Sequence, residues 1–456
     1  MSRRYLFRNI LRLVTMDDDR TEYENGWIVT EGRQIVALGG ADTVTPPADE
    51  ILDMTGHVVM PGMVNTHHHM YQSLTRVIPQ AQDASLFEWL KTLYPIWARL
   101  TPDMIRASTR TAMAELLMSG CTTTSDHLYI FPNGCRLDDE IEAAAGMGMR
   151  FHACRGSMSV GESAGGLPPD SLVEKEDEIL RDTLRLIETY HDPEPFSMLT
   201  VGGAPCSPFS VSRGLMRDMA DLARATGTRL HTHLAENQHD VDYSRERFGQ
   251  TPAEYAEDVG WLGADVWHAH CVRLDGDGMT RFGRTGTGVA HCPCSNMRLA
   301  SGIAPVSAMC GHGIPVGLGV DGSASNDGAG MLAEARQAML VSRLLSAQDD
   351  QAVMLRARDV LALATRGGAG VLGRGDIGSL EPGKAADIIA FDVYRPDYAG
   401  AQSDPVAALV FCNPTSVSFS MVNGKILIRD GHFVSLDIRD VTRQHNFLAE
   451  RLYNGR

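Results

Sequence analysis

The sequence predicts an α/β fold, namely a (β/α)8 TIM-like barrel beside a small, discontinuous β-sandwich. Two observations lead to this prediction. Short apolar strands alternate with amphipathic helices along most of the chain, whereas both chain ends are rich in strand patterns alone. The 456 residues suffice for both units, because one such barrel takes up ~250 residues. We therefore expect residues 1–60 and 376–456 to form the two parts of the sandwich and residues 61–375 to form the barrel.

The two chain ends carry matching strand patterns. The N-terminal segments are "YLFRNILRLVT", "WIVTEGRQIVALG", in which Gly32 marks a hairpin turn, and "HVVMPG". The C-terminal segments are "AADIIAFDVY" and "SFSMVNGKILIRDG", in which Asn423-Gly424 is suited to a tight two-residue turn. Strands from both ends can therefore pair into one sandwich.

The middle of the chain contains eight apolar strand candidates with amphipathic helices such as "TRTAMAELLMSG" between them. The candidates are "VVMPGMVNTHHH", "CTTTSDHLYI", "RFHACRGSM", "FSMLTVGGAP", "RLHTHLAE", "ADVWHAH", "GVAHCP" and "IPVGLGVDG". A doubly wound open sheet is the competing architecture, but no glycine-rich phosphate loop follows the first strand. The pattern therefore favours the barrel.

The composition excludes several classes of partner. The 41 Lys and Arg residues face 57 Asp and Glu residues, and the net charge of −16 repels phosphate backbones and anionic lipid, so we expect neither a nucleic-acid nor a membrane partner. No apolar run approaches the ~18 residues of a membrane helix. Arg8 and Arg12 interrupt the apolar start of the chain, which we interpret as a strand rather than a signal peptide. The nine cysteines contain no C-x-x-C pair, which indicates a reducing, cytoplasmic location.

Three histidines stand side by side in "VNTHHHMYQ", residues 64–72. Side chains two apart on a strand share a face, so His67 and His69 point one way and His68 points the other. Zinc needs ligand nitrogens at ~2.0–2.1 Å, which two such imidazoles can supply. An isolated H-x-H pattern is a weak indication of a metal site, so further ligands are needed.

Other candidate ligands end other predicted strands. His233 lies in "HTHLAE", His270 in "WHAH" and Asp321 in "VGLGVDG". Functional groups of a barrel lie at the C-terminal ends of its strands, which favours the later histidine of each pair. His231 and His268 then lie deeper and are expected to be hydrogen-bonded interior histidines.

The set His67, His69, His233 and Asp321 offers three neutral imidazoles and one carboxylate to a divalent metal. Residual positive charge on the metal would lower the pKa of a bound water from ~15.7 toward ~7. Glu236, three residues after His233, would carry a proton, with a helix-start carboxylate as the alternative. Imidazole and carboxylate accept Zn and Fe alike, and we expect one ion, zinc in the first place.

His270 would hydrogen-bond the water or the developing oxyanion, and a structural role is its alternative. Metal pairs in such barrels are often bridged by a carboxylated lysine at the end of a middle strand. The four lysines all lie elsewhere, on helix-like stretches or in the C-terminal β part: Lys91, Lys175, Lys384 and Lys425. A single metal is therefore expected, although Cys206 in "GGAPCSP" stands where a bridging ligand would go.

The segments "PGMVNTHHHMYQ", "HTHLAE", "WHAHCVRL", "HCPCSN" and "GLGVDGSASND" together resemble the amidohydrolase superfamily, in its branch of aromatic deaminases and triazine hydrolases. With the flanking β segments and "GSLEPGKAADIIAFD", the resemblance covers nearly the whole chain. It implies a barrel beside a discontinuous sandwich, a single Zn or Fe ion, and hydrolytic removal of a group from a ring carbon. It assigns metal binding to His67, His69, His233 and Asp321, and catalysis to Glu236, His270 and Asp321.

A more specific resemblance is to 8-oxoguanine deaminases, with hydroxylated-triazine aminohydrolases close by. It rests on "ASLFEWLKTLYPIWARLTPD" and "CRGSMSVGESAGGLPPDSL". Such loops cover the substrate in relatives, so it implies that Gln72, Trp89 and Arg155 recognise a flat heterocycle with carbonyl acceptors. Helix packing of Trp89 and an ion pair of Arg155 are the alternatives. His127 and His291, also near strand ends, are expected to give structural support.

The prediction for function is metal-dependent hydrolytic deamination of a small heterocycle, with 8-oxoguanine giving uric acid and ammonia, a step of purine metabolism. A triazine hydrolase and a guanine or isocytosine deaminase would use the same site. A non-catalytic binding protein on a decayed barrel is disfavoured, because every ligand and Glu236 are present. A zinc protease is disfavoured by the absence of H-E-x-x-H. A homo-oligomer is expected by analogy with related barrels.

Overall fold

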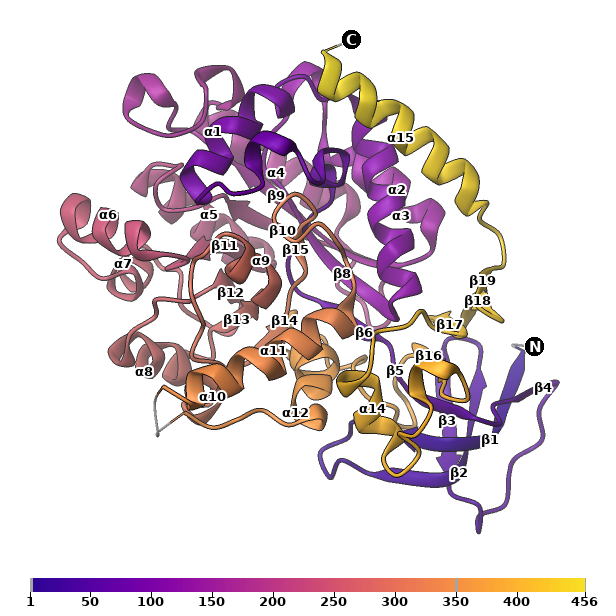
Figure 1. Cartoon of the computed structure of the whole chain (residues 1–456). Helices are drawn as coiled ribbons and strands as arrows, with labels where there is room; N and C mark the ends of the chain where they lie inside the picture. Colours follow the sequence, from indigo (N-terminus) through magenta and orange to yellow (C-terminus); the bar gives the residue numbers. More distant parts are fainter. Residues whose placement is uncertain (1–2, 349–351, 456) are drawn as a thin grey trace.

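A closed barrel of eight parallel strands forms the centre of the molecule, as predicted. The computed structural model describes residues 3–348 and 352–455 (Figure 1). The barrel strands follow one another in chain order, and the last pairs with the first. They are β6 (Met63–Asn65), β8 (Cys121–Leu128), β9 (Arg150–Ser157), β10 (Leu199–Pro205), β11 (Leu230–Leu234), β12 (Val266–His270), β13 (Gly288–His291) and β14 (Val316–Leu318).

The strands are buried on both faces, as parallel strands covered by helices are. Every residue of β8, β9, β12 and β13 is buried. Their polar side chains therefore face the barrel interior or its ends rather than water. Each strand pairs in parallel with its neighbours. The C-terminal ends of all eight strands therefore lie at the same end of the barrel.

Helices surround the barrel (Figure 1). The helix α5 shows why they form. Ser212 caps its first turn by accepting a hydrogen bond from the Leu215 backbone N–H, and Gly227 ends it in the left-handed conformation. The helices are α1 (Leu86–Trp97), α2 (Pro102–Met118), α3 (Leu137–Met147), α4 (Glu176–Tyr190), α5 (Arg213–Thr226), α6 (Gln238–Phe248), α7 (Pro252–Asp258), α8 (Gly276–Thr285), α9 (Pro293–Arg298), α10 (Val306–Gly311), α11 (Met331–Ser346), α12 (Ala357–Ala362), α13 (Gly368–Val371), α14 (Pro405–Phe411) and α15 (Ile438–Asn454).

The two chain ends pair into one nine-stranded sheet beside the barrel, which confirms the predicted flanking β unit (Figure 1). β5 and β16 join the two ends in antiparallel register, and Phe7 packs edge to face on Phe419. The Asn423-Gly424 turn is confirmed, since both residues have positive φ. The strands are β1 (Arg4–Val14), β2 (Glu22–Glu31), β3 (Gln34–Gly39), β4 (Glu50–Asp53), β5 (His57–Pro61), β16 (Ile388–Asp392), β17 (Phe419–Val422), β18 (Lys425–Arg429) and β19 (His432–Phe433).

Two predicted strands are each divided in the structure: "VVMPGMVNTHHH", and "IPVGLGVDG", which becomes β14 and β15. The segment expected to be one strand up to the histidines is split into β5 of the flanking sheet, β6 of the barrel and β7 (His68–His69). A side chain at Gly62, between β5 and β6, would lie 2.0 Å from the Thr122 hydroxyl oxygen, so only glycine fits where the chain passes from the flanking sheet into the barrel. β7 pairs with β15 (Asp321–Gly322) in a separate ladder that sets the histidines beside Asp321.

The C-terminal segment ends in a helix that the strand patterns did not predict. α15 lies along α2 on the outside of the barrel (Figure 1). The ring of His445 from α15 makes a hydrogen bond to the Ser73 carbonyl oxygen, 3.0 Å away. Within the part of the chain that the structure describes, no helix is both long enough and apolar enough to cross a membrane.

Candidate active site

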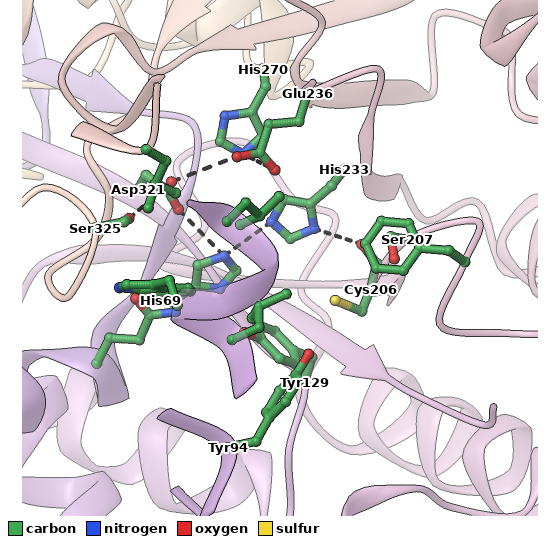
Figure 2. A pocket seen from close by; sticks show the side chains of 16 residues that line it. His69, Tyr94, Tyr129, Cys206, Ser207, His233, Glu236, His270, Asp321 and Ser325 are labelled. Atoms are coloured by element: carbon green, nitrogen blue, oxygen red, sulfur yellow. Dashed lines mark hydrogen bonds and ion pairs between the residues drawn. The ribbon is translucent and has the colours of Figure 1, made fainter. Parts of the chain in front are cut away.

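A cavity opens at the C-terminal ends of the barrel strands (Figure 2). Its titratable lining consists mainly of residues that the sequence predicted: His69, His233, Glu236, His270 and Asp321. These side chains point toward one another from four different parts of the chain. The barrel therefore brings together residues separated by up to about 250 positions, as parallel strands with a common end require.

His69 and His233 are each held by one ring nitrogen. The Nδ1 of His69 lies 2.7 Å from the His127 carbonyl oxygen, and the Nδ1 of His233 lies 2.6 Å from the Cys206 carbonyl oxygen. A carbonyl oxygen can only accept, so each Nδ1 carries the hydrogen and each Nε2 carries a lone pair. The two Nε2 atoms face each other at 3.1 Å. Two lone pairs at that distance repel unless a proton or a cation lies between them.

His67 is oriented through His231. The Nδ1 of His231 donates to the Trp267 carbonyl oxygen at 3.0 Å, so its Nε2 accepts from the Nδ1 of His67 at 2.7 Å. The Nε2 of His67 therefore also carries a lone pair. It is buried, has no hydrogen-bond partner and lies 3.2 Å from the Oδ1 of Asp321. The predicted interior role of His231 is thus a specific one, because it fixes the tautomer of His67.

Asp321 supplies the fourth donor atom. Its Oδ1 lies 3.4 Å from the Nε2 of His69 and accepts a hydrogen bond from the Gly322 N–H at 2.7 Å. Its Oδ2 accepts from the Ser325 hydroxyl at 3.2 Å. Burial opposes its ionisation, but the contact with His67 and the nearby imidazoles hold the pKa of Asp321 well below its usual range. Asp321 also has a positive φ of 59°, a backbone strain that the surrounding contacts must hold in place.

The donor set fits a divalent metal ion. Burial lowers the pKa of the three imidazoles, to about 3 for His233, so all are neutral and ready to coordinate. The 3.1–3.4 Å separations of the donor atoms match the edges, about 3.4 Å, of a tetrahedron with ~2.1 Å metal bonds. Hydrogen bonds to backbone carbonyls or to a second ring orient every imidazole, as in known metal sites.

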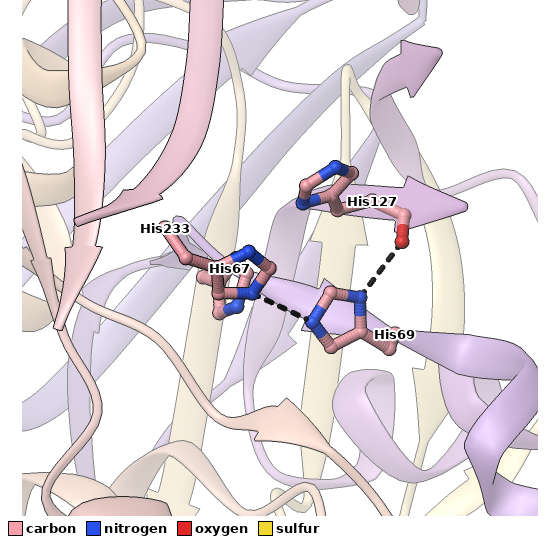
Figure 3. Close-up of side chains that lie close together, drawn as sticks. All are labelled: His67, His69, His127 and His233. Carbon is pink, nitrogen blue, oxygen red and sulfur yellow. Dashed lines mark hydrogen bonds between the residues drawn. The ribbon is translucent and has the colours of Figure 1, made fainter. Parts of the chain in front are cut away.

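The described residues contain two clusters of candidate ligand atoms, and within each cluster all of the atoms lie within 4.8 Å of one another. One contains His67, His69, His127 and His233 (Figure 3), and the other contains His67, His233, His270 and Asp321. The Nε2 of His127 is bonded to the Ala204 carbonyl oxygen at 2.7 Å, and its ring stacks on that of His233. His127 thus positions His69 through its carbonyl and His233 through its ring, in line with the support expected of it.

Glu236 and His270 lie next to the converging donor atoms. The Nε2 of His270 lies 3.7 Å from the Oε2 of Glu236 and 3.9 Å from the Oδ2 of Asp321. The Nδ1 of His270 donates to the Asn296 side-chain oxygen at 2.9 Å, which leaves its Nε2 directed at the two carboxylates. Burial disfavours the charged ring, but Glu236 and Asp321 outweigh it and raise the pKa of His270.

Burial is the main reason why the pKa of Glu236 is raised to about 7, and the nearby carboxylates of Asp240 and Asp321 add to it. The Oε1 of Glu236 accepts a hydrogen bond from the Ser301 hydroxyl at 3.4 Å. A carboxyl group with this pKa both holds and releases a proton near neutral pH, which general acid–base catalysis requires.

The predicted substrate-binding residues divide into two groups. Gln72 and Trp89 line the cavity, and Arg155 is absent from its lining. The Oε1 of Gln72 is buried without a hydrogen-bond partner among the described residues. Trp89 gives its indole N–H to the Ala324 carbonyl oxygen at 2.9 Å and also packs on Trp97, so only its ring is left for the cavity.

Arg155 forms ion pairs, which was the alternative to its predicted role in substrate binding. Its guanidinium binds Glu174 at 2.7 and 2.9 Å and Asp182 at 3.2 Å, and it lies over the ring of Phe131. These acidic partners lie 19 and 27 residues further along the chain. The guanidinium is thus committed to ion pairs within the protein.

The apolar and aromatic part of the lining was not predicted. Tyr129 directly follows β8, a position at a strand end that would have indicated it, whereas the others come from loops and α1 without a comparable sequence signal. These other apolar and aromatic residues are Leu86, Leu90, Tyr94, Phe209 and Leu299. Cys206 lines the cavity as a thiol, because burial raises its pKa to about 12.

The fold and the donor set define a metal-dependent hydrolase of the barrel type. The amidohydrolase family model matches residues 58–427, which is most of the chain. The chain therefore belongs to the amidohydrolase family.

Known proteins similar to the chain carry related names. An 8-oxoguanine deaminase of Pseudomonas aeruginosa is 44% identical, over 100% of both chains. A hydroxydechloroatrazine ethylaminohydrolase of Pseudomonas sp. is 35% identical, over 99% of this chain and 96% of that protein. The solved structure of the atrazine chlorohydrolase TrzN from Arthrobacter aurescens, complexed with zinc, superposes with a TM-score of 0.93 at 34% identity, covering 98% of this chain and 100% of that one. The predicted metal cofactor is thus supported by a zinc-containing neighbour and by a fitting donor set.

Proposed function

We propose that the chain is a metal-dependent hydrolytic deaminase of a free purine-like base, with 8-oxoguanine converted to uric acid and ammonia. The observation that carries the proposal is the convergence of three imidazole lone pairs and one carboxylate oxygen directly beside Glu236 and His270. The similarity to an 8-oxoguanine deaminase along the full length of both chains supports the choice of substrate.

We assign one divalent ion, zinc with iron as the alternative, to the Nε2 atoms of His67, His69 and His233 and the carboxylate of Asp321. When bound, the ion supplies Lewis acidity and makes a water molecule a nucleophile at neutral pH. The protein itself orients the imidazoles, because His231 and the carbonyls of His127 and Cys206 form hydrogen bonds to them.

The remaining roles follow from the positions of the side chains. Burial raises the pKa of Glu236 to about 7, so the protonated form is well populated near neutral pH and gives its proton to the ring nitrogen next to the amine-bearing carbon. Although burial disfavours the charged ring, Glu236 and Asp321 raise the pKa of His270 and so favour its imidazolium form. In this form Nδ1–H donates to Asn296 and Nε2–H donates to the oxyanion that forms when water attacks that carbon. One proton of the water replaces the proton that Glu236 gave, and Asp321 accepts the other and passes it to the departing ammonia. Water adds and ammonia leaves, so the atoms balance.

The cavity wall suits a flat ring with hydrogen-bonding edges. The free Oε1 of Gln72 is an acceptor for a ring N–H, and the ring of Trp89 offers an apolar surface to the heterocycle. We do not retain Arg155 in the proposed substrate site, because Glu174 and Asp182 already bind its guanidinium.

We further propose a cytoplasmic homo-oligomer. All nine cysteines are unpaired, which agrees with a reducing compartment. Large apolar side chains on the outer surface of α15, Phe447 and Tyr453, are exposed and would be covered by a second copy of the chain. Light scattering after size-exclusion chromatography tests the assembly, and a monomer at micromolar concentration would contradict it.

A triazine hydrolase is the second candidate, favoured by the 35% identity to an aminohydrolase of that kind and by the superposition with TrzN. Both candidates are tested by one panel. The zinc-loaded protein is given 8-oxoguanine, guanine, isocytosine, a hydroxylated triazine and a chlorinated triazine, and the release of ammonia, alkylamine or chloride is measured.

We expect a kcat/KM for 8-oxoguanine at least about 100-fold above that for the other compounds, a discrimination that polar contacts to a ring can give. Uric acid formation confirms the product. Turnover of a triazine alone would contradict the deaminase and establish the second candidate. The Glu236→Gln protein is the matched control, because it keeps the metal ligands and should turn over every compound of the panel far more slowly than the wild type.

A further inference from the structure

A second cavity lies at the opposite end of the barrel, where β9, β10 and β11 begin. It has a volume of about 430 Å³. His152 near the start of β9, Thr200 near the start of β10 and Arg229 just before β11 line it. The lining of this cavity shares no described residue with that of the candidate active site. The same three strands thus start at one cavity and end at the other.

Arg229 is a largely buried cation without an acidic partner. No carboxylate within the described ranges forms an ion pair with it, and its Nε is buried without a hydrogen-bond partner. One Nη donates to the Val371 carbonyl oxygen at 2.7 Å. Burial lowers the pKa of Arg229 to about 10. A buried guanidinium of this kind is stabilised when an anion reaches its free N–H groups.

The loop beside Arg229 is shaped to admit the guanidinium. Gly373 has a φ of +68°, and a side chain there would lie 2.3 Å from the Nη1 of Arg229. Any other residue would therefore be strained in its backbone and would displace the guanidinium. The close approach keeps Arg229 in the cavity wall instead of letting it extend to solvent.

His152 offers a second unsatisfied polar atom in the same wall. Its side chain is buried, its Nδ1 lies 3.0 Å from the Thr200 hydroxyl, and its Nε2 has no hydrogen-bond partner. When the hydroxyl donates to Nδ1, the Nε2 carries the hydrogen and is a buried donor without an acceptor among the described residues. His152 and Arg229 flank the same indole: their distances to the Trp267 ring are 5.1 and 5.9 Å.

The remaining charges of the lining leave an excess of donors. Arg374 binds Asp376 with two N–H groups, so this pair is neutral. His191 accepts the Val201 N–H at its Nδ1, which leaves the hydrogen on Nε2. Glu194 is the other carboxylate of the lining and lies at its exposed rim. This donor-rich cavity stands out in a chain whose net charge of −16 repels anions elsewhere.

We propose that this cavity binds a tetrahedral oxyanion of the phosphate class, free or as the end of a phosphate ester, through the free N–H groups of Arg229 and His152. A planar guanidinium fork and an imidazole N–H from a second direction suit the oxygens of a phosphate group. The site is separate from the proposed deamination and does not depend on it.

Calorimetric titration of the zinc-loaded protein with inorganic phosphate tests the proposal, and a parallel titration with glycerol phosphate distinguishes the free anion from an ester. We expect one phosphate per chain whose affinity falls about tenfold or more in Arg229→Gln. Arg181→Gln, which removes an exposed arginine of α4, is the matched control and should bind as the wild type does. Phosphate held by the active-site metal would persist in both variants, so Arg229-independent binding, or no binding up to about 10 mM, overturns the proposal.

A second measurement does not depend on the stability of a variant. Crystals of the wild-type protein are soaked in selenate, and anomalous diffraction locates the anion. We expect a peak within hydrogen-bond distance of the Arg229 guanidinium and the His152 Nε2. Ordered side chains around this cavity without a peak would overturn the proposal.

Discussion

The two ends of the barrel use the same residue type for opposite tasks. At the C-terminal end, His69 and His233 give their Nδ1–H groups to backbone carbonyls, so their Nε2 lone pairs converge. At the N-terminal end, the Nδ1 of His152 lies 3.0 Å from the Thr200 hydroxyl, and a hydroxyl that donates to Nδ1 leaves the hydrogen on the unpartnered Nε2. The partner of one ring nitrogen thus decides whether the other binds a cation or an anion.

The surrounding charges reinforce this difference. Asp321 and Glu236 accompany the histidines at the C-terminal end, whereas an unpaired arginine accompanies His152 at the other end. The same closed strands therefore separate a site for a metal from a site for an anion. Substitutions at the C-terminal end of the barrel, and others outside both sites, test this account.

The largest effect is expected for His69→Ala. Loss of one of four ligands leaves lone pairs and a carboxylate that can no longer hold the ion tightly, so metal content should fall below about one tenth of an equivalent and turnover by more than about 10⁴-fold. Elemental analysis and ammonia release measure the two quantities. His312→Ala, a change of an exposed histidine, is the control. Full metal occupancy in His69→Ala would contradict the ligand assignment.

Glu236→Gln should separate metal binding from proton transfer. The amide keeps the shape of the side chain but cannot give a proton, so kcat should fall by about 10²–10⁴-fold while one equivalent of metal remains. Steady-state kinetics and elemental analysis check both. A rate near that of the wild type would remove Glu236 from the mechanism.

The pH dependence follows from the same group. Because Glu236 acts as an acid and burial raises its pKa to about 7, the active protonated form is lost as pH rises through 7. We expect kcat/KM to fall by about tenfold per pH unit above that point. The descending limb should disappear in Glu236→Gln. A profile that is flat from pH 6 to 9 in the wild type would be inconsistent with this role.

A buried carboxyl pair below the metal ligands should affect stability instead of chemistry. Burial raises the pKa of Asp126 to about 7 and that of Glu140 well above its usual range, and Asp126 accepts the Met70 N–H at 2.7 Å. The folded state keeps a proton that the unfolded chain loses above pH ~4, so this stabilisation is present at low pH and is lost as pH rises through 7.

Glu140→Gln carries no such proton. Between pH 5 and 8 the free energy of unfolding should therefore fall by about 1 kcal/mol more in the wild type than in the variant, as measured by denaturation at each pH. Equal pH dependence of the two proteins would show that the pair is not protonated in the folded state.

The smallest effect on catalysis is expected for Arg155→Gln. Its guanidinium ties Glu174 and Asp182 to β9, so the variant should melt at a lower temperature while KM stays within about twofold of the wild type. Thermal denaturation and kinetics with 8-oxoguanine measure the two quantities. A tenfold rise in KM at an unchanged melting temperature would restore the substrate-binding role that the sequence suggested.

Local spacing was enough to predict which side chains converge at the C-terminal end of the barrel. The i, i+2 pattern of His67 and His69 and the position of His233 and Asp321 at the ends of apolar segments are properties of a few neighbouring residues. Parallel strands then bring such positions to one end whatever the loops do. The barrel and the pairing of the two chain ends follow from the same kind of periodicity.

The features that were missed depend on contacts between distant segments. Thr122 leaves no room for a side chain at Gly62, and the ladder between β7 and β15 joins residues more than 250 positions apart. The cavity around Arg229 arises in the same way, because its lining comes from segments up to about 220 positions apart. A sequence pattern records what a strand or helix buries, but not which loop will provide its partner.

The central claim is that one ion is held by three oriented imidazoles and one aspartate. Anomalous diffraction at the zinc edge from crystals of the zinc-loaded protein tests it most directly. The account predicts a single peak at about 2.0–2.2 Å from the Nε2 atoms of His67, His69 and His233 and from a carboxylate oxygen of Asp321. Two peaks, or one peak bound by His127 with Asp321 turned away, would contradict it.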